Sequence, residues 1–180
     1  MRFGFEAYSW QTAANHYIGR LDHVIDVVSE CRITGIEAEV CMLGPYAGEP
    51  TMLRAALDSR GMSLASVCYV EDWHGRGESD GEAARADWVI DYLDHFPGTL
   101  LQLCPRSGSD RGDLRERQRN AIRCMNDVSR RAADVSFLAE TGFDGWAIVD
   151  DESPLAHADP DEAARRDAAY VHGTLSVGPG

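Results

Sequence analysis

Residues 2–9 read RFGFEAYS and residues 36–43 read IEAEVCML, and the segment between them follows a different pattern. The two quoted stretches are short, apolar and rich in aromatic or β-branched residues, as buried strands are. From Leu21 to Ile33, apolar residues recur at steps of three and four with acidic residues on the other side, which is typical of an amphipathic helix. A strand, a helix and a second strand in this order predict a parallel pair joined by a crossover helix.

The same alternation continues to the end of the chain and predicts an α/β fold with about five parallel strands. One helical pattern, from Leu114 to Leu138, would extend about 40 Å if unbroken, or bend near Asp134. We expect a single domain over residues 1–173 and a C-terminal tail over residues 174–180. The remaining strands are predicted at 63–69, 99–104 and 146–149, and the remaining helices at 50–60, 82–96 and 161–172.

Composition excludes several classes of function. The 180 residues include 17 Lys+Arg and 30 Asp+Glu, a formal net charge of -13. Because this charge repels phosphates and anionic lipids, we expect neither nucleic acid nor a membrane as a partner. Every basic residue is arginine, which excludes a lysine Schiff base and a Walker-type phosphate loop. The 5 cysteines lack metal-binding spacing, and no stretch has the pattern of a signal peptide or membrane span. We expect a soluble, reduced, cytoplasmic protein.

Four strand motifs carry a resemblance to a known family. Residues 4–10 read GFEAYSW, residues 35–40 read GIEAEV, residues 63–73 read SLASVCYVEDW and residues 137–153 read FLAETGFDGWAIVDDES. In their order and spacing these motifs resemble the sugar phosphate isomerase/epimerase family, whose members are xylose isomerase-like (β/α)8 barrels. The resemblance covers two blocks, residues 1–134 and 135–173. It implies strands one to four, followed directly by strand eight and the last helix.

The length of the chain departs from the family pattern. A full barrel of this kind usually needs about 250 residues, and the segment matching strands five to seven is missing. The resemblance therefore implies a partial or contracted TIM-like barrel. Because an incomplete barrel leaves open strand edges, we expect a homodimer or a higher homo-oligomer.

The resemblance also implies a divalent cation (Mn, Mg, Co or Zn) held by residues of strands five to eight. Only the strand-eight ligand has a counterpart, at Asp150, with Glu152 as an assisting group. Hard cations need several oxygen ligands, so we do not expect the family's metal mechanism to be inherited unchanged. From the residues alone, Asp150 is a metal ligand or general base, or else part of a solvated acidic loop.

Further acid–base candidates lie on the second and third strands. Glu37 and Glu39 are two residues apart and point to one face of a strand. Glu37 lies either inside the barrel near a substrate or outside it beneath helix ends. Glu71, Trp73 and His74 close the third strand, where they form either a sugar-stacking and proton-transfer cluster or an ordinary loop.

Four other residues are candidate substrate contacts. Tyr8, Trp10 and His16 follow the first strand and either form an aromatic wall against a polyol or serve packing alone. Arg106 follows the fourth strand and either binds a phosphate or carboxylate or stays solvated.

These residues predict an isomerase or epimerase acting on a small carbohydrate or polyol by proton abstraction next to a carbonyl. Asp150 is the first candidate base, and Glu37, Glu71 and His74 are its possible partners. Two alternatives remain open: a non-catalytic binding or assembly protein that kept the barrel scaffold, and a metal-independent isomerase or lyase of secondary metabolism.

Overall fold

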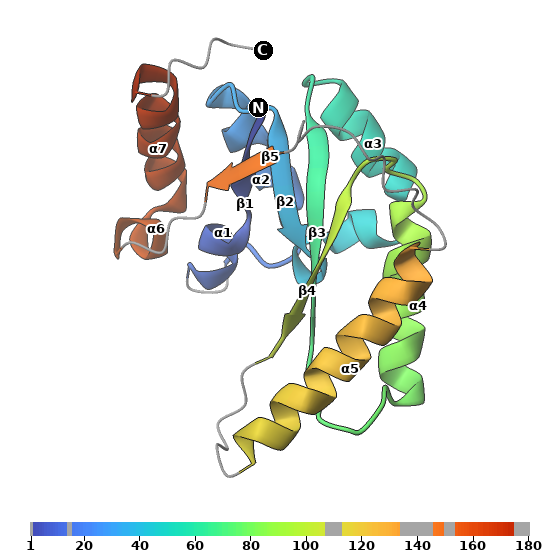
Figure 1. The fold of residues 1–180 in the computed structure, drawn as a ribbon. Coiled ribbons are helices and arrows are strands. Elements are labelled where there is room, and N and C mark those ends of the chain that lie inside the picture. The colour runs from blue at the N-terminus through green and yellow to red at the C-terminus, as the bar shows by residue number, and fades with distance from the viewer. Residues whose placement is uncertain (1, 14–15, 107–112, 134–145, 150–153, 175–180) are drawn as a thin grey trace. The chain divides into compact units, whose positions relative to one another are not determined.

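A computed structural model describes residues 2–13, 16–106, 113–133, 146–149 and 154–174. Its five strands form one sheet in the order β4-β3-β2-β1-β5 (Figure 1). Strand β1 pairs in parallel with β2 on one side and with β5 on the other. The predicted α/β fold with about five parallel strands is therefore confirmed. The strands are β1 (Arg2–Glu6), β2 (Gly35–Glu39), β3 (Ser63–Glu71), β4 (Leu100–Pro105) and β5 (Trp146–Val149).

Two predicted strands end earlier than their apolar pattern indicated. After β1 the chain turns into helix α1 (Tyr8–Thr12), in which Gln11 N donates to Ala7 O at 3.1 Å. After β2 it forms the 3-10 turn η1 (Val40–Met42). The expectation of extended strand over these residues was wrong because a short apolar run has no period that separates a strand from a buried turn.

The longer helices lie where the periodicity predicted them. Helix α3 begins at Pro50, which suits a first helical turn because it lacks an N–H to satisfy. Helix α4 begins earlier than expected, because Ser79 and Glu82 cap each other's backbone N–H groups. The pattern predicted α5 up to Leu138; its described part ends at Ala133. The helices are α2 (Leu21–Glu30), α3 (Pro50–Asp58), α4 (Asp80–Leu93), α5 (Leu114–Ala133), α6 (Pro154–Ala158) and α7 (Pro160–Thr174), with a second 3-10 turn η2 (Gly44–Ala47).

The chain divides into two compact units. The first unit comprises residues 1–67 and 142–180, and the second comprises residues 68–141. Strand β3 begins in the first unit and ends in the second. The expectation of one domain over residues 1–173 stays a prediction. Among the described residues, no helix combines the length and apolar character that crossing a membrane requires.

The first unit is built on strands that are apolar on one face. Phe5 of β1 is in register with Ile36 of β2, and both are buried. Helix α2 contributes a buried stripe of apolar residues at helical spacing: Leu21, Val24, Ile25 and Val28. The chain comes especially close to itself where Gly44, with a φ of 54°, lies against Gly19. A Cβ on Gly44 would meet Gly19 O at 2.0 Å, so only glycine fits there.

Candidate functional site

The first unit places two glutamates at paired positions of neighbouring strands. Strands β1 and β2 repeat the pattern Gly-apolar-Glu-Ala, and their register pairs Gly4 with Gly35 and Glu6 with Glu37. Because paired positions of adjacent strands share one face of a sheet, Glu6 and Glu37 lie on the same face. The buried Phe5–Ile36 pair lies on the opposite face.

Glu37 is a buried carboxylate held by a hydroxyl group. Its side chain belongs to the few buried charged groups of the described chain, with 5% exposure. The Ser66 hydroxyl of β3 donates to Glu37 Oε2 in a short hydrogen bond. The backbone of Glu37 is also fixed, because Ala7 N donates to its carbonyl oxygen at 2.9 Å. The Ser66 hydroxyl is a neutral donor, in contrast to the guanidinium partners of other carboxylates in the chain.

The other predicted residues near the ends of β1 and β2 lie in different surroundings. Glu39 accepts a hydrogen bond from Gln11 Nε2 at 2.7 Å. Tyr8 is half-buried on α1, and His16 is exposed after it. Trp10 is 1% exposed, so its ring is surrounded by protein. The substrate-binding roles of Tyr8, Trp10 and His16 stay predictions.

A second polar cluster of the first unit joins α7 to α1 and α2. Asp161, the second residue of α7, accepts from Trp10 Nε1 at 2.7 Å. The same carboxylate lies 3.1 Å from His23 Nε2, and the ring of His23 stacks on Tyr17 with centroids 4.9 Å apart. This cluster ties together residues 151 positions apart in the sequence.

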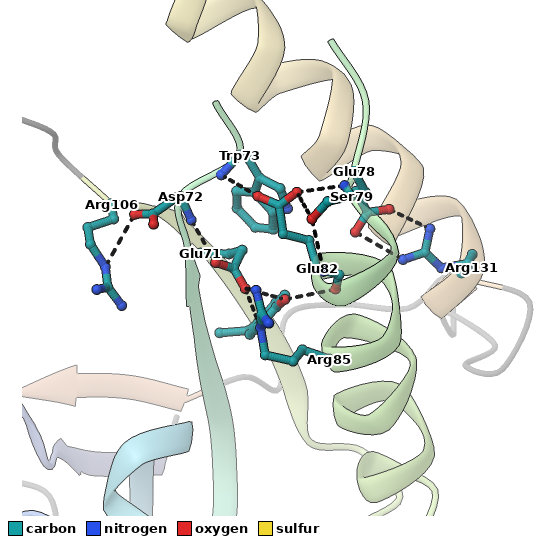
Figure 2. A network of polar contacts seen from close by, with 10 residues as sticks. Glu71, Asp72, Trp73, Glu78, Ser79, Glu82, Arg85, Arg106 and Arg131 are labelled. Carbon is teal, nitrogen blue, oxygen red and sulfur yellow. Dashed lines mark hydrogen bonds and ion pairs between the residues drawn. The ribbon is translucent and has the colours of Figure 1, made fainter. Parts of the chain in front are cut away.

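The second unit contains a denser network around Glu71, which Figure 2 shows in close view. Glu71, 8% exposed, ends β3. Its carboxylate lies 2.6 Å from Arg85 of α4 and accepts from Asp72 N at 3.0 Å and from the Tyr69 hydroxyl at 3.1 Å. Burial opposes ionisation of Glu71, but these three donors together hold the pKa of its carboxyl below the ordinary value. Burial and the neighbouring Glu71 raise the pKa of the Tyr69 phenol.

Trp73 lies within this network in an uncommon backbone conformation. Its φ is 44°, a left-handed value that is rare for a bulky residue. Its backbone N–H donates to Glu82 Oε1 at 3.0 Å (Figure 2). Its ring meets Tyr69 edge to face with centroids 5.6 Å apart. The ring is fully buried, and its Nε1 has no hydrogen-bond partner among the described residues.

His74 and Arg106 are exposed members of the second unit. Arg117 of α5 lies 3.2 Å from His74 Nε2, and Asn120 of α5 donates to the His74 carbonyl at 2.9 Å. Arg106 N donates to the Glu71 carbonyl at 2.8 Å, and its side chain lies 3.6 Å from Asp72. The structure therefore brings Glu71, Trp73, His74 and Arg106 into one unit, while their roles in catalysis or binding stay predictions.

Several polar residues of these sites were missed by sequence reasoning. Glu6 could have been found from the repeated Gly-apolar-Glu-Ala pattern in the first two strands. The others carry no local signal. Ser66, Arg85 and Asp161 have partners distant in the sequence. Tyr69 lies in an apolar strand pattern that gives no sign of its bond to Glu71.

The predicted metal ligands Asp150 and Glu152 lie outside the described residues, as does much of the acidic loop to which they belong. Within the described part of the chain, no group of three or more His, Cys, Asp or Glu residues is arranged to hold a metal ion. The described residues therefore supply no ligand set for a divalent cation. A cation bound through Asp150 and Glu152 stays a prediction.

Comparison with solved structures identifies the architecture. The chain is similar to the crystal structure of the probable 3-DHS dehydratase AsbF, involved in petrobactin synthesis, from Bacillus anthracis, with a TM-score of 0.53 and 13% identity. The chain has the fold of a partial xylose isomerase-like barrel. The match covers 93% of this chain and 59% of the AsbF chain, so this partial barrel spans well under two thirds of that protein. No protein-family model and no curated protein matches the sequence.

Proposed function

We propose that this partial barrel is an enzyme of the isomerase–lyase type that removes a proton next to a carbonyl, with Glu37 as the base. The observation that carries the proposal is the buried Glu37 carboxylate on a parallel strand, beside Glu6 in register and held by the Ser66 hydroxyl. In barrels of parallel strands, catalytic groups come from the carboxyl ends of several strands. Glu37 lies in the last three residues of β2, and Glu6 is the last residue of β1.

The proposed step uses two carboxyl groups in different roles. Glu37 takes the proton from the carbon next to the substrate carbonyl, and the C–H electron pair moves to form an enolate on that oxygen. Glu6 is the second acid–base group, beside Glu37 in the register. For an isomerase or epimerase, a carboxyl group returns a proton to carbon; for a lyase, the enolate collapses and a neighbouring hydroxyl leaves as water after protonation.

The proposed substrate is a small carbohydrate, polyol or hydroxy-ketone. The fold supports this class because barrels of this type act on such molecules in the family that the sequence resembles. Asp150, Glu71, His74 and Arg106 remain predicted contributors. No step is assigned to a metal ion.

One variant of this function has specific support. AsbF is described as a probable dehydratase, and dehydration begins with the same proton abstraction as isomerisation. We therefore propose a lyase as the second candidate reaction. The third candidate is a binding protein that kept the scaffold without catalysis.

Hydrogen–deuterium exchange at carbon tests the proposal without knowledge of the product. The purified protein is incubated in D2O with D-fructose, D-xylulose or hydroxypyruvate, and proton NMR follows loss of the signal next to the carbonyl. Ultraviolet absorbance of an α,β-unsaturated carbonyl reports dehydration in the same samples. Parallel samples contain EDTA or added Mn2+, so that a cation requirement is read directly.

Glu37→Gln is expected to lower the exchange rate at least about 100-fold, the usual contribution of a general base. Glu39→Gln is the matched control, because Glu39 lies on the same strand and contacts Gln11. It is expected to retain the rate within about threefold, as a residue outside proton transfer would. Equal rates in the wild type and in Glu37→Gln would contradict the assignment of Glu37, and a wild type inactive on all probes would favour the binding protein.

A further inference from the structure

The outer face of α4 is acidic. The helix buries Ala86, Val89 and Ile90 on one side. On the other side, helical spacing brings four exposed aspartates together, and the last of them follows the helix end. Trp88 flanks this row with 37% exposure, while its ring packs against Tyr92 with centroids 5.4 Å apart. The four aspartates are Asp80, Asp87, Asp91 and Asp94.

The outer face of α5 has the opposite charge. This one helix contains six of the seventeen arginines of the chain and only two acidic residues. It buries Cys124 and Val128, and exposes Arg115, Arg119 and Ile122 on the other side. Ile122, with 58% exposure, lies three residues after Arg119 and seven after Arg115, so the three share one stripe of the helix.

The charges on these two faces are only partly neutralised within the second unit. Arg131 of α5 lies 2.9 Å from Asp87 and 2.7 Å from Glu78. Among the described residues, Arg115 and Arg119 have no carboxylate partner, and Asp91 and Asp94 have no cationic one. Figure 1 shows α4 and α5 side by side, so one layer presents both an acidic and a cationic face.

We propose that the α4–α5 layer is a homodimer interface, in which α4 of one copy packs on α5 of the other. In a two-fold interface each contact occurs twice with its partners exchanged, so one copy must carry both complementary surfaces. The α4–α5 layer carries both surfaces, because α4 presents aspartates with Trp88 and α5 presents arginines with Ile122. Pairing the two faces places opposite charges together and covers the exposed side chains of Trp88 and Ile122. The proposal therefore places the contact with the second copy on α4 and α5, and not on an open edge of the sheet.

Sedimentation equilibrium of the full chain measures the dimer directly. The wild type is expected to be a dimer whose dissociation constant rises with NaCl, because salt screens the charge pairs. Asp91→Arg and Arg119→Asp are each expected to raise the dissociation constant about tenfold, since each sets like charges against each other. The double variant, with both charges reversed, is expected to recover most of the wild-type affinity.

Two controls separate the interface from general effects. Asp58→Arg reverses an exposed charge at the end of α3 and is expected to leave the dissociation constant unchanged. Trp88→Ala removes the flanking contact without changing the charge and is expected to weaken the dimer at least about tenfold. Circular dichroism checks that each variant is folded. A monomeric wild type would overturn the proposal, as would a dimer that none of the α4 and α5 variants weakens, or a double variant no tighter than the single ones.

Discussion

Glu37 in the first unit and Glu71 in the second are both buried carboxylates on parallel strands, but they have different partners. Glu37 accepts a hydrogen bond from a serine hydroxyl and stands in register with another carboxylate. Glu71 lies against the Arg85 guanidinium and accepts from a backbone N–H and a phenol. The donors of Glu71 stabilise its anion, which makes it a poor proton acceptor. Burial alone therefore does not make Glu71 a candidate base, because its partners favour the anion.

The largest expected difference between the two carboxylates is in the free energy of unfolding of variants that replace each of them. Glu71→Gln is expected to lower the free energy of unfolding by about 2–3 kcal/mol, because it removes hydrogen bonds to a charged group and leaves buried donors without an anion. Glu37→Gln is expected to change it by less than about 1 kcal/mol, since an amide can still accept from Ser66. Urea unfolding measures both values, and hydrogen exchange over residues 68–133 locates the loss. A larger loss from Glu37→Gln would reverse the comparison.

The pH dependence of stability is a second test of the role assigned to Glu71. The pKa of Glu71 is lowered in the folded protein, so the unfolded chain binds the proton more tightly. The stabilisation is therefore complete above the ordinary glutamate pKa of about 4.3 and is lost as the pH falls through the lower folded value. The unfolding free energies of the wild type and of Glu71→Gln should differ at pH 7 and converge in acid. Curves that stay parallel down to the pH of acid unfolding would show that Glu71 is not the group responsible.

The smallest expected effect is that of Trp73→Phe, at a residue whose buried Nε1 has no partner among the described residues. Trp73→Phe removes this donor but also part of a buried ring, and these two changes oppose each other. We expect the free energy of unfolding to change by less than about 1 kcal/mol. Trp73→Ala, which deletes the whole ring, provides the contrast at about 3–5 kcal/mol. Equal losses from the two variants would indicate that the indole N–H does have a partner.

Sequence reasoning located the strands well and the side-chain partners poorly. The five strands and the start of α3 at Pro50 followed from local periodicity and turn residues, which depend on a few neighbouring positions. The register of Glu6 beside Glu37 was missed, although the repeated Gly-apolar-Glu-Ala pattern marks it. Arg85 was missed because nothing near it in the sequence indicates Glu71, fourteen positions away.

The partial barrel was implied by the resemblance of the strand motifs to a known family. The order of residues along the chain was sufficient by itself to determine the alternation of strands and helices. This is because burial leaves a periodic trace in the sequence. Only the tertiary structure decided which carboxylate meets a hydroxyl, which meets a guanidinium, and that Asp161 of the last helix meets Trp10. Such pairs depend on strand order and helix packing. These bring together side chains that are far apart in the sequence, so no local sequence pattern reveals the pairing.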